Sequence, residues 1–156
     1  STVVLANISG ARKRAQEAVL ISALKQVELG LLMLAEREGR TFWWPESDFG
    51  FGSNPDISEL ITDTNRLGKT ISQDFSMPIG TNMGYDNDQN VFVCGDGGTI
   101  YRGVNVHIRN VPLDRAEAIN QTVDNDGTLL CGKIKWDPSG GGSLFYVLSE
   151  DPTIGM

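Results

Sequence analysis

The segment that decides the fold runs from Leu20 to Leu34 and reads LISALKQVELGLLML. Its large apolar side chains recur at spacings of four and three residues, which places them on one side of an α-helix. These positions are Leu20, Leu24, Val27, Leu31 and Leu34. The stripe predicts a helix that buries one face against the rest of the protein.

The helical pattern extends upstream, so the sequence predicts a single helix over residues 4–38. The same rhythm continues there with mostly small side chains, at Val4, Ile8, Ala11, Ala15 and Ala18. We therefore expect the second half of the helix to be buried and the first half to be only lightly buried. A helix of about 35 residues spans roughly 50 Å, whereas a domain of this size is about 30–40 Å across. The helix is expected to project from its own domain.

The charge of the chain disfavours one class of partner. Its 156 residues include 13 basic and 20 acidic side chains, a net charge of −7. A surface this acidic repels a phosphate backbone, so we expect no nucleic-acid partner. Residues 1–40 carry six basic and four acidic side chains, or +2, which leaves −9 for the remainder. A basic helix is thus joined to an acidic body.

The rest of the sequence predicts a loop followed by an antiparallel sheet. Pro45 ends the long helix, and residues 45–90 look irregular apart from a short helix at Ile57–Arg66, which Asp56 or Ser58 could cap. Gly95–Gly98 is a hairpin signal between two predicted strands. The remaining predicted elements are strands at Asn90–Cys94, Thr99–Arg109, Leu129–Trp136 and Leu144–Leu148, a helix at Leu113–Val123, and a turn at Ser139–Ser143. This order indicates a single α+β domain.

Few residues offer metal or catalytic chemistry. One histidine and two cysteines are too few for a Cys/His zinc site, no apolar run approaches the ~18 residues of a membrane span, and no cofactor is expected. His107 stands alone on a predicted strand and is interpreted as structural or surface-exposed. No catalytic serine motif or phosphate-binding loop is present.

Two Asp-rich stretches match part of a calcium loop. They are Asp86–Asn90, with Asp86, Asp88 and Asn90, and the stretch that holds the weak metal candidates Asp124 and Asp126. Neither stretch continues to a bidentate glutamate at the required spacing. Asx-rich turns are the simpler interpretation of both.

The two cysteines bracket the predicted helix at Leu113–Val123. We expect Cys94 and Cys131 to pair, because an even count on neighbouring sheet elements suits an exported protein. Two buried free thiols remain the alternative. A redox role is not expected, since the chain has no Cys-x-x-Cys motif.

Several segments together resemble type IV pilins, and type IVb pilins in particular. The first is LANISGARKRAQEA at residues 5–18, which is followed by LKQVELGL at residues 24–31 and by the aromatic exit Trp43-Trp44-Pro45. The stretch Val106–Pro112, with the helix after it, is also similar to type IVb pilins. The family's processing site and the apolar half-helix after it are absent from the sequence, which we interpret as truncation.

The resemblance implies a long N-terminal helix packed on an antiparallel sheet of four or more strands. Residues 1–156 would form one pilin domain, with a helix at 1–40, an αβ-loop region at 41–90, and a sheet with a disulfide-bounded D-region at 91–156. Cys94 and Cys131 would bound the D-region. The αβ-loop and the D-region would face outward.

The resemblance also implies a structural, non-enzymatic subunit of a surface pilus. Its partners would be other pilin subunits and the inner-membrane assembly machinery, with membrane contact only through the absent N-terminal segment. The filament would serve adhesion, motility or DNA uptake. The assembly residues would be Ile8, Arg12, Lys13, Arg14 and Glu17, although a solvated helix face is an equal interpretation of these charges. The alternatives are a type II secretion pseudopilin and a secreted binding domain or enzyme.

Overall fold

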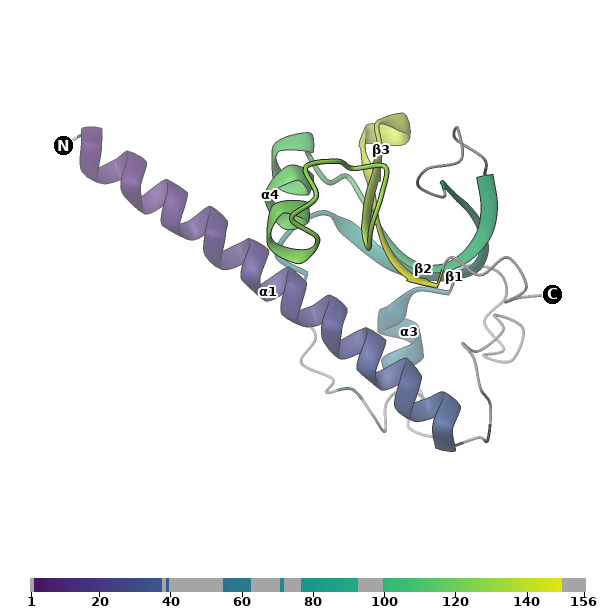
Figure 1. Cartoon of the computed structure of the whole chain (residues 1–156). Coiled ribbons are helices and arrows are strands. Elements are labelled where there is room, and N and C mark those ends of the chain that lie inside the picture. The colour runs from purple at the N-terminus through teal and green to yellow at the C-terminus, as the bar shows by residue number, and fades with distance from the viewer. Residues whose placement is uncertain are drawn as a thin grey trace.

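The computed structural model describes residues 2–37, 39, 55–62, 71, 77–92 and 100–149. In these residues the fold is α+β, as predicted, with one long helix beside a four-stranded antiparallel sheet (Figure 1). The elements in chain order are α1 (Thr2–Arg37), α3 (Ile57–Thr62), β1 (Thr81–Phe92), β2 (Ile100–Arg109), α4 (Leu113–Val123), β3 (Ile134–Asp137), the 3₁₀ turn η2 (Ser139–Gly141) and β4 (Ser143–Ser149).

Helix α1 matches the predicted 4–38 helix to within two residues at each end. All five residues of its inner stripe, Leu20 to Leu34, are at most 2% exposed. They pack against one face of the sheet, so their burial explains why this half of the helix is fixed. The N-terminal half of α1 runs past α4 and out of the body of the molecule (Figure 1). The predicted overhang is therefore present.

The sheet has the strand order β1-β2-β4-β3, and every neighbouring pair is antiparallel. Side chains alternate between its two faces. The face toward α1 carries the core, with Val104, Val106 and Ile108 of the central strand β2 fully buried. Tyr85 and Tyr146 extend this core onto β1 and β4. The sheet thus supplies the surface that holds the C-terminal half of α1.

Both short helices form close to their predicted positions. Helix α4 has its predicted bounds, because Pro112 precedes it and Asp124 ends it. Helix α3 begins at the predicted residue, Ile57, and is described to Thr62; residues 63–66 of the prediction lie outside the described residues. Its start is fixed by Asp56, whose Oδ1 accepts hydrogen bonds from the backbone N–H of Ser58, at 2.8 Å, and from its hydroxyl. Asp56 is therefore the capping residue of the two that were considered.

The first strand was largely missed. Strand β1 begins at Thr81, so the sheet starts well inside the region that was expected to be an irregular loop up to residue 90. The sequence signal is weak because Met83 and Tyr85 are the large apolar side chains at the start of this strand, among polar residues. Strand β1 is determined by its pairing instead. It pairs with β2 on one side, and on the other side the backbone N–H of Tyr85 donates a hydrogen bond to the Pro55 carbonyl at 2.9 Å.

The third strand is shorter than predicted and begins at Ile134. The chain before it turns around the carboxylate of Asp124, which accepts a hydrogen bond from Ile134 N–H at 2.7 Å. Gly132 has a φ of 78°, and a Cβ there would lie 2.6 Å from Asp124 Oδ2. This turn removes Leu129–Lys133 from the strand. The predicted Gly95–Gly98 hairpin turn and the Trp43-Trp44-Pro45 exit lie outside the described residues.

Candidate functional site

Helix α1 carries two apolar stripes on opposite sides. The inner stripe, Leu20 to Leu34, is buried against the sheet. The outer stripe faces solvent, and its Ile8 and Leu29 side chains are 59% and 58% exposed. Its other exposed members are Ala11, Ala15, Ala18, Val19, Leu32 and Met33. An apolar stripe this long on the surface is typical of an interaction site.

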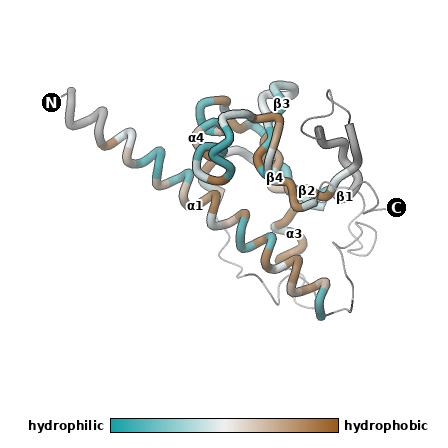
Figure 2. Tube along the Cα trace, viewed as in Figure 1, coloured by the Kyte–Doolittle hydropathy of each residue, from teal (hydrophilic) through white to brown (hydrophobic). Residues whose placement is uncertain are grey.

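The outer stripe corrects one sequence interpretation. The series from Val4 to Ala18 was expected to continue directly into the inner stripe. From Ala18 to Leu20 the series advances by only two residues, which is about 200° around a helix. The upstream residues therefore lie on the side opposite Leu20, and Leu29 follows on that side after the exposed polar residues Ser22, Lys25 and Gln26. Figure 2 shows that the part of α1 beneath the sheet is more hydrophobic than the coloured segment that precedes it.

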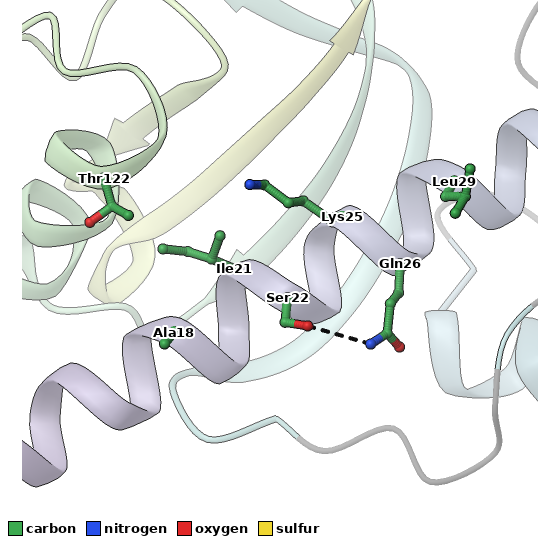
Figure 3. Close-up of a pocket in the computed structure, with 7 residues that line it drawn as sticks. All are labelled: Ala18, Ile21, Ser22, Lys25, Gln26, Leu29 and Thr122. Atoms are coloured by element: carbon green, nitrogen blue, oxygen red, sulfur yellow. Dashed lines mark hydrogen bonds between the residues drawn. The ribbon is translucent and has the colours of Figure 1, made fainter.

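An open groove lies where the outer stripe passes the end of α4 (Figure 3). Its volume is about 430 Å³. Thr122 of α4 forms one wall, and the other lining residues belong to α1, from Ala18 to Leu29. Ser22 and Gln26 are joined by a hydrogen bond of 3.4 Å at this groove, and Lys25 is its charged residue. The groove offers an apolar surface to an elongated partner.

Two of the helix charges predicted to contact neighbours are paired inside the chain. Glu17 binds Arg115 of α4, with 3.2 Å between Oε1 and Nη1, and both side chains are nearly buried. Lys13 binds Asp114 at 3.3 Å, but this pair is exposed. These contacts attach α4 to the middle of α1.

Arg12 and Arg14 remain available as the basic charges of the outer surface. Both side chains are exposed, and neither forms an ion pair within the described part of the chain. On a helix of 3.6 residues per turn they flank the outer stripe on its two sides. Together with exposed Ile8, they are the members of the predicted assembly set that still face outward.

A second polar attachment holds α1 to the sheet. Tyr146 of β4 donates its hydroxyl hydrogen to Glu28 Oε2 at 2.5 Å, and Lys133 donates to Glu28 Oε1. The Lys133 ammonium also lies 5.0 Å above the Tyr146 ring. Burial raises the pKa of Tyr146 above its ordinary value, as do the hydrogen bond to Glu28 and its negative charge.

This attachment was not predicted, although the sequence contains a signal for it. Glu28 lies next to Val27 at the edge of the apolar stripe, and a carboxylate at the border of a buried face requires a partner. Its partners come from the last third of the chain, so spacing alone does not identify them.

The sheet face turned away from α1 carries polar residues. His107 of β2 is 8% exposed, and its ring lies over Gly84, where a Cβ would approach His107 Cε1 to 2.4 Å. Burial, and then the charge of Arg109, lowers the pKa of His107, while Asp56 opposes this shift. Asn105 is fully buried on the same face. The structure thus places the lone histidine in a packed structural position.

The two calcium-like stretches behave differently. Asp126 accepts a hydrogen bond from Thr128 N–H at 3.1 Å, which is the expected Asx turn. The Thr128 bond and one from the Asn120 amide lower the pKa of Asp126, the Asn120 bond contributing most. Asp86, in contrast, is buried within β1, so the turn interpretation of that stretch was wrong. Among the described residues, no cluster of three His, Cys, Asp or Glu side chains is arranged to hold a metal ion.

No family model, curated protein or solved structure matches the chain. The fold and the surface of α1 are therefore the observations from which function must be inferred.

Two further observations concern export and membranes. Cys131 is disulfide-bonded, whereas Cys94 lies outside the described residues, so the Cys94–Cys131 pairing stays a prediction.

In the described part of the chain one helical stretch, Ile8–Arg37, is long and apolar enough to cross a membrane, although half of its most apolar window is buried inside the protein. The stretch contains no long uninterrupted apolar run, because polar residues such as Lys25 and Glu28 divide it, so it was not predicted from the sequence. Core helices and signal sequences have the same property.

Proposed function

We propose that the chain is a structural subunit of a type IV pilus that polymerises through α1. The observation that supports this most is the exposed outer stripe of α1, which starts at Ile8 in the projecting half and reaches Leu29 on the solvent side of the buried half. A contact that joins this stripe to a different surface of the next copy is heterologous, and its repetition yields an open filament.

The side chains of the outer stripe suit a close helix contact. The side chains of Ala11, Ala15 and Ala18 are small, and two packed helices approach more closely when the side chains between them are small. Ile8 and Leu29 supply larger apolar contacts on either side of this segment. The α1–α4 groove extends the same surface onto α4.

The charges are compatible with head-to-tail assembly. Arg12 and Arg14 flank the stripe, whereas the chain beyond residue 40 has a net charge of −9. Attraction between the basic helix of one copy and the acidic body of another would orient the contact. The layout of one long helix on an antiparallel sheet also agrees with the pilin resemblance of the sequence.

The test uses the natural full-length gene product in its own cells. Surface fibres would be sheared and labelled with an antibody to this domain, and labelling along each fibre is expected. Ile8→Asp and Leu29→Asp should abolish the fibres because they place charge in the contact. Leu113→Asp is the matched control, since Leu113 is an exposed apolar residue of α4 outside the stripe.

The alternative outcomes are distinct. Fibres that form normally with both α1 variants would contradict assembly through this face. Retention in the periplasm, together with a secretion defect on deletion, would identify a type II secretion pseudopilin. A folded, unassembled secreted protein would favour the binding-domain alternative.

A further inference from the structure

His107 lies where three parts of the chain meet. It belongs to β2, its ring covers Gly84 of β1, and Gly84 in turn forms a β-bridge with Asp56, the residue that caps α3. Phe145 of β4 stands beside the ring, with 6.4 Å between the two ring centroids. A Cβ on residue 84 would lie 2.6 Å from His107 Nε2. The imidazole ring thus takes the space of a side chain on β1, at the point where β1 contacts the segment before α3.

The ring is packed as a neutral group. His107 is 8% exposed, and its Nδ1 atom is buried without a hydrogen-bond partner. Asn105 lies two residues earlier on the same face of β2, and it does not serve Nδ1, since both polar atoms of its own side chain are unpaired. A protonated imidazole carries a hydrogen on each nitrogen. Protonation would therefore place a positive charge and an unpaired N–H donor inside this packed face.

The charged residues around the ring do not compensate for its burial. In the described part of the chain, those on this face or beside it are Arg109 of β2, Lys135 of β3, Asp86 of β1 and Asp56 before α3. Strand β4 contains no charged residue. Burial, and then the charge of Arg109, lowers the pKa of His107, and Asp56 opposes this shift without cancelling it.

Acid therefore favours a state in which the ring reaches water. In an opened chain the imidazole has its ordinary pKa of 6.5, whereas the folded protein holds a lower pKa. The folded arrangement is favoured above pH 6.5, and it loses stability as the pH falls through the folded-state pKa of His107. Strand β1 is at the edge of the sheet, so it can separate while β2, β4 and β3 remain paired.

We propose that His107 is an acid-sensitive switch whose protonation releases β1, together with Pro55 and Asp56, from the rest of the sheet. The unit that moves is defined by its hydrogen bonds. The Tyr85 N–H donates to the Pro55 carbonyl at 2.9 Å, so this bond is lost when β1 and the segment before α3 separate.

The experiment measures hydrogen exchange of two amides by NMR, at about pH 7.5 and about pH 5, on either side of the ordinary histidine pKa. The Tyr85 amide reports on β1, and the Val147 amide, which donates to the Lys133 carbonyl at 2.8 Å, reports on β4. After correction for the intrinsic effect of pH, we expect Tyr85 protection to fall about fivefold or more in acid, the low end of the cost of a buried unpaired donor. Val147 protection should not change.

Two further measurements assign the effect to the imidazole. His107 is the single histidine of the chain, so the Cε1–H signal reports its protonation directly and should titrate below pH 6.5. Arg109→Gln removes a cation beside the ring and should move this titration, and the loss of Tyr85 protection, to higher pH. Arg12→Gln, which removes an exposed arginine of α1, is the matched control and should move neither. His107→Phe should abolish the pH dependence of Tyr85 protection.

Three results would overturn the proposal. They are a His107 titration at or above its ordinary pKa, Tyr85 protection that is equal at both pH values, and equal losses at Tyr85 and Val147, which would mean that the whole sheet opens. The first readout uses the unchanged chain, so it decides the matter even where His107→Phe does not fold. All measurements use unassembled chain, so their outcome is independent of the filament test.

Discussion

The two halves of α1 are one continuous helix, yet different forces hold them. Between Leu20 and Ala35 the helix buries an apolar face against the sheet. From Ile8 to Val19, a fully described stretch, no side chain is buried, and the attachments are polar contacts to α4. The comparison teaches that the first half is not stabilised by its own core, so its apolar residues are available to a partner.

The largest expected effect is on the buried half. Leu24→Ala should cost about 3 kcal/mol of unfolding free energy, because it leaves a cavity at a fully buried site. Val19→Ala, at an exposed site of the same helix, should change it by less than about 0.5 kcal/mol. Urea unfolding followed by circular dichroism measures both. Similar losses of unfolding free energy in Leu24→Ala and Val19→Ala would contradict the difference in burial between the two halves of α1.

The buried ion pair should produce the next largest effect. Arg115→Met leaves Glu17 nearly buried without its partner, which we expect to cost about 2 kcal/mol. The double variant Glu17→Leu/Arg115→Met should recover most of this loss, because no charge is left unpaired. A double-mutant cycle measures the coupling. Additive losses would show that the pair does not attach α4 to α1.

Removal of the Tyr146 hydroxyl tests the attachment of the buried half. Tyr146→Phe should cost about 1.5 kcal/mol at neutral pH, the lower end of the net value of a hydrogen bond to a charged acceptor. The folded protein also holds the pKa of Tyr146 above its ordinary value near 10. Only the unfolded chain then loses this proton as the pH rises above 10, so stability falls there.

The alkaline loss of stability should therefore be steeper in the original chain than in Tyr146→Phe. Urea unfolding at a series of alkaline pH values measures this difference. Parallel pH profiles for the two proteins would contradict the assigned role of the hydroxyl.

The smallest effect is expected at the exposed pair. Lys13→Ala should change stability by less than about 0.5 kcal/mol, since both partners are more than half exposed. The same unfolding assay, run beside Arg115→Met, compares the two α1–α4 contacts directly. A loss as large as that of Arg115→Met would mean that the exposed pair also holds the helix.

Local signals in the sequence predict the helices well. Pro112 marks the start of α4, and the Asp124–Gly127 turn marks its end. The spacing of apolar residues by four and three positions predicts the buried half of α1. Strand β1 was missed because pairing, rather than an apolar pattern, determines it. The shortened β3 depends on the position of Asp124, which spacing does not reveal.

The candidate site was predicted only in part. The overhang followed from helix length, and Ile8, Arg12 and Arg14 do face outward. The partner of Glu17 lies almost a hundred residues away in Arg115, so no local pattern indicated it. The outer stripe could have been recognised from the two-residue step between Ala18 and Leu20.

The two polar attachments of α1 also have a mechanical consequence. Glu17 and Glu28 attach α1 to the body of the protein at points eleven residues apart, or about 16 Å along the helix axis. A helix attached at two separated points can neither rotate about its axis nor move along it unless both attachments break. Force applied to the projecting end of α1 is therefore carried to the body of the protein through both attachments, by Arg115 of α4 at one and by Lys133 and Tyr146 at the other.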